Sequence, residues 1–328
     1  MATRYVIYGA GAIGAAVGAH LWRTDHSVLL VGRAAHVNRI REAGLSLVTP
    51  DETFVLHVPA TIDLRDTGVQ PGDVILLCVK SQDTETALRE VRDAGADPKS
   101  VPIFCLQNGI TNEDRALRLF ENVHGVMLNA PGVYLEPGVV SNPIRGNAGF
   151  MDIGRYPVGT DDVTQRTVSD LIKAGYAVNE HHRVMEAKRA KFLGNLGNSL
   201  GAITDGAGDS AQFLREVRRE GEDCLIASGL AFENPDEFNA RVARSRGETA
   251  MAPGQRNLGS TWQSLMRGAT SLETDFLNGE VVRMGRLHGV PTPHNAVLQE
   301  TVARMHASGS RPGRFTVADL EGFVASRG

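Results

Sequence analysis

Metal-binding cysteine motifs, long apolar runs and an excess of basic residues are all missing from this chain of 328 residues. Cys78, Cys105 and Cys224 do not have metal-ligand spacing, and the first two lie inside apolar runs, so we expect small buried side chains there. No apolar stretch approaches a membrane span, and the first apolar run, from Tyr5, begins too early for a signal peptide. The formal net charge is -4 and the basic residues are scattered, which argues against nucleic-acid and membrane partners. We therefore expect a cytoplasmic protein.

The N-terminal segment has the pattern of a strand, a glycine turn and a helix. The apolar run Tyr5–Tyr8 leads into GAGAIG and a helical pattern, and a second strand, Ser27–Val31, follows at the expected distance. Gly9 would permit the tight turn, Gly11 would let the backbone approach a pyrophosphate, and Gly14 would let the helix pack closely on the strand. The phosphates would lie at the helix N-terminus. In this context the motif predicts dinucleotide binding, and a purely structural glycine turn is the alternative. The predicted cofactor-binding residues of this turn are Gly9, Ala10, Gly11, Ala12, Ile13 and Gly14.

The end of the second strand indicates which dinucleotide is bound. A site that prefers NAD places an acid there for the ribose 2'-hydroxyl, but no Asp or Glu lies between His26 and Arg41. Arg33 occupies this region, and its guanidinium can bind a 2'-phosphate in bidentate fashion. The sequence therefore predicts NADP(H), and the alternative is that Arg33 is a solvated surface residue.

The chain divides into two halves with different patterns. Up to about Asn179, short β-rich runs alternate with helical segments, which predicts a mostly parallel sheet covered by helices. Strands are expected at 73–79, 102–106, 125–128, 138–141, 149–153 and 176–178, with helices at 84–94, 113–120 and 162–174. From Val184 onward the strand pattern disappears, and helices are expected at 184–203, 209–230, 235–246, 271–288, 293–307 and 316–326, with loops at 205–209 and 247–258. We expect a Rossmann-like NADP-binding domain over residues 1–180 and an all-helical substrate and catalytic domain over residues 181–328.

Two polar clusters follow predicted strands directly. Lys80 comes after Ile75–Val79, and Asn108 lies in the Gln-Asn-Gly that follows Ile103–Leu106. The carboxyl ends of parallel strands form the ligand crevice of an open α/β sheet, so both side chains should face the cofactor. The alternatives are a surface lysine at the start of a loop and an ordinary Asn-Gly turn.

A polar stripe marks the first helix of the second half. Lys188, Lys191, Asn195 and Asn198 recur at spacings of three, four and three, which places them on one face of a helix over 184–203. Asn has a lower helix propensity than Glu, Lys or Arg, so it is a poor choice for a helix face that is merely exposed to solvent. The two asparagines therefore favour the wall of a polar cavity over an exposed face.

Together these motifs resemble the ketopantoate reductase family over essentially the whole chain. The resemblance is carried by GAGAIG, Arg33, CVKSQDT around Lys80, LQNG around Asn108, KFLGNLGN from Lys191, STWQSLMRGATSLETDFLNG from Ser260, and HGVPTPHN. Only the first motif is common among unrelated dehydrogenases. The lysine with an asparagine four residues later, together with the glutamate in SLETDFLNG, is far more specific.

The resemblance implies a role for each matched residue. Lys191 would be the catalytic acid, with Glu273 as its partner carboxylate, and Asn195 and Ser260 would hold the substrate. Asn198 or Ser199 would supply the second substrate-binding side chain. The cofactor NADPH would be held by the glycine turn, Arg33, Lys80 and Asn108. Since the family pattern selects Lys191, we expect Lys188→Ala to have little effect.

The chain also departs from the family pattern, which leaves the substrate open. Arg189 stands where a Trp is typical, Asn198-Ser199-Leu200 replaces Asn-Pro-Leu, and an asparagine expected near Asp205 has no counterpart. Three functions compete. The first is reduction of 2-dehydropantoate to (R)-pantoate in pantothenate biosynthesis, the second is reduction of another small ketone or imine on the same scaffold, and the third is a non-catalytic NADP(H)-binding regulator. The partner is a small 2-oxo acid, and the oligomeric state stays open, with a homodimer as one option.

Overall fold

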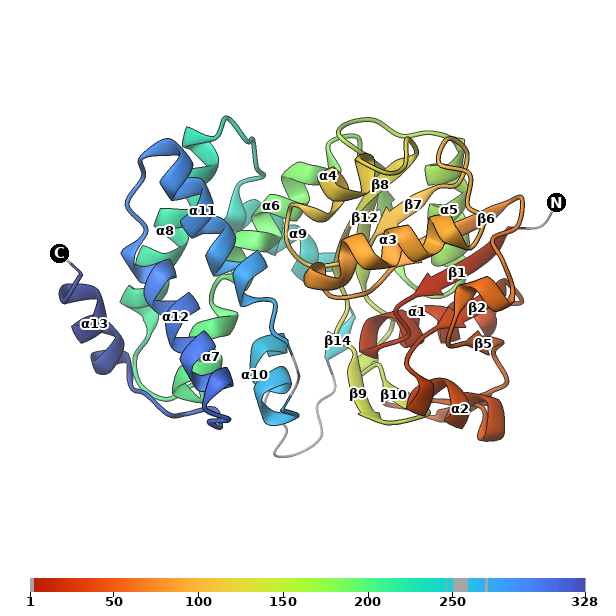
Figure 1. Ribbon diagram of the computed structural model, residues 1–328, viewed down its shortest axis with the longest axis horizontal. Coiled ribbons are helices and arrows are strands. Elements are labelled where there is room, and N and C mark those ends of the chain that lie inside the picture. The colour runs from red at the N-terminus through yellow and green to blue at the C-terminus, as the bar shows by residue number, and fades with distance from the viewer. Residues whose placement is uncertain (1–2, 246, 250–258, 269–270, 328) are drawn as a thin grey trace. The chain divides into compact units, whose positions relative to one another are not determined.

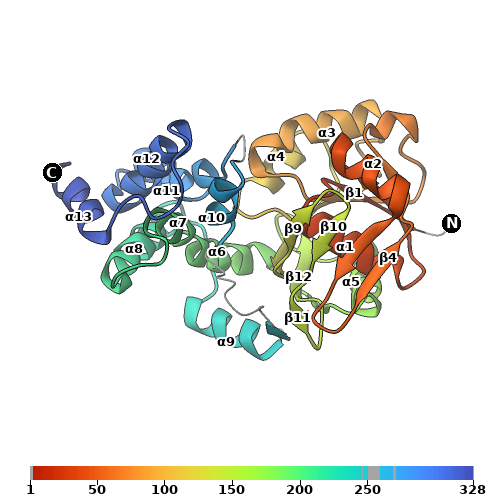
Figure 2. The same ribbon diagram turned by 90° about the horizontal axis from the view of Figure 1, so that it is seen from below.

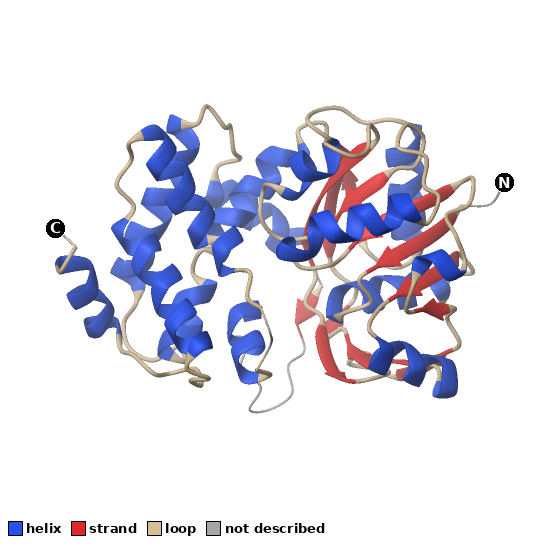
Figure 3. Ribbon diagram, in the orientation of Figure 1, coloured by secondary structure: helices blue, strands red, loops and turns tan. Residues whose placement is uncertain are grey.

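The computed structural model describes residues 3–245, 247–249, 259–268 and 271–327. The chain divides into two compact units. Unit 1 consists of Met1–Lys188 and Asp236–Ala252, and unit 2 consists of Arg189–Pro235 and Pro253–Gly328. All the strands in the described residues belong to unit 1, whereas the described part of unit 2 contains only helices and loops (Figure 3). The predicted fold class is confirmed.

An eight-stranded sheet is the centre of unit 1 (Figure 1). In spatial order its strands are β13 (Ala177–Glu180), β12 (Phe150–Arg155), β8 (Val123–Asn129), β7 (Ile103–Cys105), β6 (Asp73–Leu77), β1 (Arg4–Tyr8), β2 (Ser27–Val31) and β5 (Ala60–Thr61). Only the pairing of β12 with β8 is antiparallel. The carboxyl ends of β1, β2, β6 and β7 therefore meet at one edge of the sheet, which is where the predicted cofactor residues follow them.

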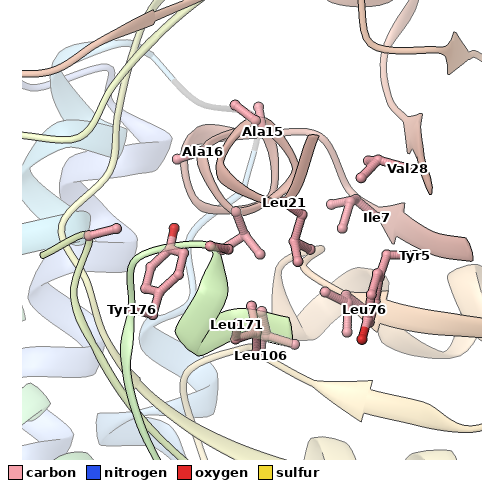
Figure 4. Packing of buried hydrophobic residues seen from close by; sticks show 14 of the residues in the cluster. Tyr5, Ile7, Ala15, Ala16, Leu21, Val28, Leu76, Leu106, Leu171 and Tyr176 are labelled. Atoms are coloured by element: carbon pink, nitrogen blue, oxygen red, sulfur yellow. The ribbon is translucent and has the colours of Figure 1, made fainter. Parts of the chain in front are cut away.

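Helices cover both faces of the sheet because its central strands are apolar on both faces. Alternate residues of β1 belong to different cores. Tyr5 and Ile7 pack against α1 (Ala12–Trp22) and α5 (Asp162–Lys173), as Figure 4 shows. Val6 and Tyr8 belong to the opposite core with α3 (Thr84–Asp93) and α4 (Asn112–Leu117). The remaining helical elements of residues 3–188 are α2 (Ala34–Ala43), η1 (Leu64–Asp66), η2 (Ser81–Asp83) and the first turns of α6 (Val184–Asn195).

Two smaller sheets complete unit 1, and of their strands the sequence predicted only the one at 138–141, which is β10. One has the order β4 (Thr53–Leu56), β3 (Leu45–Val48), β10 (Val139–Ser141), β9 (Val133–Glu136). The other pairs β11 (Ile144–Arg145) with β14 (Glu248–Thr249).

The β14 strand and helix α9 (Pro235–Ser245) bring a late part of the sequence back to unit 1 (Figure 2). The Arg241 guanidinium binds both oxygens of the fully buried Asp152 in β12, at 2.9 and 2.7 Å. The Asn147 side chain donates to the Ser245 carbonyl and accepts from the Gly247 amide. Burial raises the pKa of Asp152, while Arg241 opposes that shift.

Unit 2 begins within α6, at Arg189. Its other helices are α7 (Asn198–Thr204), α8 (Ala211–Ala227), α10 (Gly259–Met266), η3 (Thr274–Phe276), α11 (Asn278–His288), α12 (Pro293–Ala307) and α13 (Val317–Ala325). A buried carboxylate fixes the start of α12. Glu220 of α8 accepts from the backbone amides of His294 and Asn295 and from both their side chains. Four donors on one carboxylate tie the two helices together at the point where the first amides of α12 lack partners within the helix.

The helix predictions for the second half need three corrections. The helix expected over 184–203 is two helices, because α6 ends at Asn195 and α7 starts at Asn198. The helix expected over 271–288 begins only at Asn278, after the short η3. Part of the loop expected over 247–258 is strand β14, and its residues 250–258 lie outside the described residues. Among the cysteines, Cys105 and Cys224 are buried, but Cys78 is half-buried.

One buried histidine makes the stability of unit 1 depend on pH. His20 of α1 is 8% exposed, and its ring packs edge-to-face on Tyr176. Burial and the nearby Arg23 lower the pKa of His20 from 6.5 to about 4. In the unfolded chain the ring takes up a proton below pH 6.5, but in the folded chain it stays neutral down to about pH 4. Protonation thus favours unfolding as the pH falls through this window.

We expect His20 to account for a loss of about 2–3 kcal/mol in unfolding free energy between pH 7 and pH 4.5. Urea unfolding of wild type and His20→Gln at both pH values checks this. The variant should lose less stability on acidification than the wild type does. Parallel losses in the two proteins would contradict the assignment.

Candidate functional site

The glycine turn after β1 has the geometry that a dinucleotide site requires at two of its glycines. Gly9 has a φ of +107°, and a Cβ there would lie 2.6 Å from the Val79 backbone nitrogen. A Cβ on Gly14 would lie 2.3 Å from the Gly9 carbonyl oxygen. Contacts within the protein therefore require glycine at both positions.

Gly11 differs from its neighbours because no protein atom requires a glycine there. It is exposed, it has an ordinary negative φ of -87°, and a Cβ would meet nothing within 4 Å. It is also the N-cap of α1, whose first turn carries no acidic side chain. An open glycine in front of a helix N-terminus fits a group that approaches the backbone closely and carries negative charge. The turn at Gly11 and the N-terminus of α1 therefore fit a pyrophosphate.

Arg33 occupies the carboxyl end of β2, one residue past Gly32. It is exposed and forms the extended N-cap of α2, and no acidic residue lies in the first turn of that helix. The Gly32 amide is bound by the Thr61 carbonyl of the neighbouring β5. The local charge at this edge of the sheet is therefore suited to an anion.

The loops after β6 and β7 carry the other two predicted cofactor residues. Lys80 and Asn108 are both half-buried. The backbone nitrogen of the preceding residue, Val79, lies against Gly9, so the backbone before Lys80 is close to the glycine turn. The hydroxyl of Ser81 donates to the Asn108 carbonyl at 3.2 Å, and the Asn112 amide donates to the same carbonyl at 2.8 Å.

Buried polar side chains join these two loops into one unit, and the sequence analysis missed them. Gln107 donates to Thr84 at 2.9 Å, and Thr84 donates to Asn112, also at 2.9 Å. Asn112 donates in turn to Ser81, and Arg115 donates to the Ser81 carbonyl. Their signal in the sequence was weak, because isolated Ser, Thr and Asn residues near strand ends look like ordinary turn residues. The network holds the backbone around Asn108 by side chains from both loops.

The structure overturns the expectation for Lys188. Its side chain is buried, and its ammonium group binds the carbonyls of Cys105 and Gln107, at 3.1 and 3.2 Å, and the Glu113 carboxylate. Lys188 therefore does not belong to an open polar face with Lys191, and its replacement by alanine leaves a buried carboxylate without its cation. We therefore replace the expectation of little effect by the prediction that Lys188→Ala destabilises the protein.

The remaining predicted residues belong to unit 2. Lys191 and Asn195 lie one turn apart on α6, and both are half-buried. Glu273 is half-buried and lies at the N-cap of η3, where its carbonyl accepts from the Phe276 amide. Asn198 lies beyond the end of α6, at the first residue of α7, so the predicted single stripe is interrupted after Asn195.

The structure brings Asn198 together with the segment that carries Ser260. A Cβ on Gly259 would lie 2.8 Å from the Asn198 side-chain oxygen, and Gly259 has a φ of +86°. Gly259 and Ser260 begin α10, whose first turn has no acidic residue. The Asn198 side chain therefore lies at the N-terminus of α10, against the residue before Ser260. Sequence reasoning did not identify Gly259 as the residue that permits this approach.

Ser199 has a different environment. It is fully buried, and its hydroxyl donates to Asn278 at 2.6 Å. Asn278 also donates to the Leu196 carbonyl and to Asn295, which links the start of α7 to α11 and α12. The side chain of Ser199 thus takes part in the core of unit 2.

The region where the family asparagine was expected also has its own partners. Asp205 has a φ of +53° and ends α7, and its carboxylate accepts from the Trp262 indole at 2.8 Å. This contact holds the end of α7 against α10.

The described residues contain no group of three or more His, Cys, Asp or Glu side chains that could hold a metal ion. Within those same residues, no helix is long and apolar enough to cross a bilayer.

Comparison with known proteins gives consistent matches along the chain. Residues 5–157 match the family model described as ketopantoate reductase PanE/ApbA, and residues 183–306 match the model of its C-terminal part. A 2-dehydropantoate 2-reductase from Pyrococcus horikoshii is 30% identical over 312 residues, which cover 92% of this chain and 97% of the relative.

Two solved structures show how widely the fold is shared. A PanE/ApbA family ketopantoate reductase from Ralstonia eutropha JMP134 is 30% identical, with a TM-score of 0.79 and coverage of 94% of this chain and 99% of that chain. D-mandelate dehydrogenase with NADH and anilino(oxo)acetate is 22% identical, with a TM-score of 0.80 and coverage of 93% and 99%. The second comparison concerns the fold alone.

Proposed function

Because the chain belongs to the ketopantoate reductase family, we propose that it reduces the keto group of a 2-oxo acid with NADPH. The leading substrate is 2-dehydropantoate, which would yield (R)-pantoate for pantothenate biosynthesis. The observation that carries the proposal is the glycine turn, where Gly9 and Gly14 are required by protein contacts and Gly11 is open. A nicotinamide cofactor needs this arrangement at its pyrophosphate.

NADPH is proposed over NADH because of Arg33. Its exposed side chain stands at the end of β2 without a nearby acid in α2, so a 2'-phosphate would meet a cation there. Lys80 and Asn108 are proposed to contact the cofactor from the loops after β6 and β7. A protein of this fold, D-mandelate dehydrogenase, was solved with NADH, so the choice between the two cofactors has to be measured for this chain.

We expect Arg33→Ala to reduce the preference for NADPH over NADH by about ten- to a hundredfold, because one charged contact is worth about 1.5–3 kcal/mol. The measurement is KM for both cofactors in wild type and variant. The exposed Arg39 of α2 supplies the matched control, and Arg39→Ala should leave the ratio unchanged. Equal use of both cofactors by the wild type would refute the assignment.

The proposed chemistry places the proton donor on α6. A bound nicotinamide supplies a hydride to the carbonyl carbon, and negative charge then develops on the carbonyl oxygen. The Lys191 ammonium stabilises this charge and donates the proton that completes the alcohol. Glu273 is proposed to keep Lys191 charged.

The substrate carboxylate needs donors that do not compete for the catalytic proton. Asn198 and Ser260 suit this role because the Asn198 side chain lies against Gly259, the residue before Ser260. The N-terminus of α10 adds amide donors and a partial positive charge. Asn195 lies one turn beyond Lys191 and is proposed to hold the same substrate. Asn198 is preferred to Ser199 as the second substrate residue, because the Ser199 hydroxyl is buried and donates to Asn278.

A second candidate function is reduction of a different small ketone or imine by the same residues. It is favoured by the region near Asp205, where the asparagine expected from the family has no counterpart and Asp205 itself accepts from Trp262. A missing donor changes selectivity strongly, since a site built to bind a substrate hydroxyl discriminates by several powers of ten.

Steady-state NADPH oxidation tests the proposal. The panel contains 2-dehydropantoate, straight and branched 2-oxo acids, an aryl 2-oxo acid, and 2-oxo acids paired with amines. Highest kcat/KM for 2-dehydropantoate supports the leading substrate, and highest kcat/KM for another member supports the second function. NADPH binding without turnover of any substrate would instead indicate a non-catalytic binding protein.

A further inference from the structure

The ion pair of Lys188 and Glu113 is a buried charged cluster that the proposed chemistry does not use. Lys188 is 4% exposed and Glu113 is fully buried. Burying two opposite charges stabilises a protein little, because the loss of hydration offsets their attraction. The second carboxylate oxygen of Glu113 is also buried and has no hydrogen-bond partner among the described residues, which makes the pair a poorer stabiliser still.

The ammonium group of Lys188 joins three different elements. It donates to the Cys105 carbonyl at the end of β7 (3.1 Å), to the Gln107 carbonyl in the following loop (3.2 Å), and to Glu113 in the first turn of α4. These are three acceptors for three N–H donors, so the group is fully used. The two carbonyls lie on either side of Leu106, and the second belongs to the residue directly before Asn108.

The helix on which Lys188 lies is the one that carries Lys191. Val184–Asn195 is a single helix, so the contacts of Lys188 fix the rotation of α6 about its axis. They also fix how far α6 is shifted along that axis relative to the end of β7. The Gln107 side chain continues the connection through Thr84 to Asn112 and Ser81. One cation therefore links α6 to both cofactor-facing loops.

We propose that Lys188 and Glu113 form a positioning pair that fixes the backbone of the Asn108 loop to helix α6, the helix that bears the catalytic lysine. The catalytic part of this inference rests on the proposed function. Its structural part, the coupling of loop and helix, does not. The proposed chemistry assigns neither residue a contact with the reacting atoms. Misplacement by about 1 Å lowers rates by up to about a hundredfold, so the loss of the pair should appear in turnover.

An ion pair between strands β1 and β6, with a buried carboxylate, gives a control. Arg4 binds both oxygens of Asp73, at 2.9 and 2.6 Å, and also the Gly68 carbonyl. These residues begin β1 and β6, so the pair lies at the opposite edge of the sheet from the cofactor loops. Asp73 is as deeply buried as Glu113, whereas Arg4 is partly exposed, and the pair does not contact a predicted functional loop.

The first experiment compares Glu113→Gln with Asp73→Asn. Both should lower Tm, Glu113→Gln by about 10 °C and Asp73→Asn by less, because Arg4 is partly exposed to water. Turnover at saturating NADPH and substrate is expressed per NADPH-binding site, counted by fluorescence titration, which removes any unfolded fraction. We expect Glu113→Gln to lose about ten- to a hundredfold in kcat per site and Asp73→Asn to lose less than about twofold. Similar kcat per site in the two variants would overturn the catalytic part.

The second experiment separates positioning from stability. Replacing both charges, in Lys188→Met with Glu113→Leu, should restore much of the Tm because apolar pairs substitute well for buried ion pairs. The kcat per site should stay low, because the carbonyls of Cys105 and Gln107 have lost their common donor. Recovery of kcat together with Tm would show a purely structural role.

Amide hydrogen exchange without cofactor or substrate tests the coupling itself. The double variant should exchange faster than the wild type in peptides covering 106–113 and 184–190, and Asp73→Asn should leave these peptides unchanged. Unchanged exchange in the double variant would overturn the coupling. If the wild type reduces no compound of the panel, the proposed function fails, and the exchange result still decides whether the pair joins loop and helix.

Discussion

Lys191→Ala should lower kcat by about two to four orders of magnitude and leave NADPH binding nearly unchanged. Positioned general acids supply about 10²–10⁴ in rate, and Lys191 is proposed to act only when charge develops on the substrate oxygen. The cofactor is proposed to bind through residues of unit 1, so its dissociation constant should not depend on a side chain of unit 2. Steady-state kinetics and fluorescence titration measure the two quantities separately.

The control for Lys191 is Lys173, an exposed lysine on α5 that forms a surface ion pair with Asp170. Lys173→Ala should change kcat by less than about twofold, since such pairs contribute little. If Lys191→Ala retained wild-type kcat, the assignment of the proton donor would fail and the register taken from the family resemblance would have to be abandoned.

Gly11→Val should weaken NADPH binding by about ten- to a hundredfold while leaving Tm unchanged. A Cβ at this position would meet no protein atom within 4 Å, and the backbone φ of -87° is allowed for any residue, so folding should tolerate the change. It would, however, occupy the space in which the proposed pyrophosphate approaches the backbone, and overpacking of this kind costs about 1–3 kcal/mol.

Gly14→Ala provides the contrast. Its Cβ would lie 2.3 Å from the Gly9 carbonyl oxygen, so this variant should lose both Tm and NADPH affinity. Thermal unfolding and NADPH titration of the two variants make the comparison. Wild-type affinity in Gly11→Val would show that the cofactor does not approach the turn at that glycine.

Local patterns in the sequence predicted unit 1 well. The glycine turn, the strands on either side of α1 and the polar residues after β6 and β7 follow from periodicity and from the position of strand ends, which are properties of short segments. The small sheet of β3, β4, β9 and β10 was missed, apart from the strand expected at 138–141, because its strands are three to four residues long and its two halves lie far apart along the chain. A pattern that short is not separable from loop sequence.

The environment of Lys188 could not be predicted for a different reason. Helical spacing placed it on one face with Lys191 and Asn195, and helical spacing cannot identify acceptors that lie 75 to 83 residues earlier in the chain. The break of the helix after Asn195 was equally hidden, because Leu196 and Gly197 leave the polar period of three and four intact. Tertiary contacts, and not local propensity, decide both points.

Because α9 and β14 belong to unit 1, neither unit is a single continuous segment of the chain, and the units cannot be exchanged as N-terminal and C-terminal halves. The chain passes between the units after Lys188, Pro235 and Ala252, so an exchange of unit 2 between relatives needs three junctions. A shortened chain that stopped at residue 180 would lose Arg241 and leave the fully buried Asp152 without its cation, at a cost of about 3–5 kcal/mol. Recombination at a single crossover point between residues 189 and 235 would therefore produce chimaeras in which Asp152 comes from one parent and Arg241 from the other.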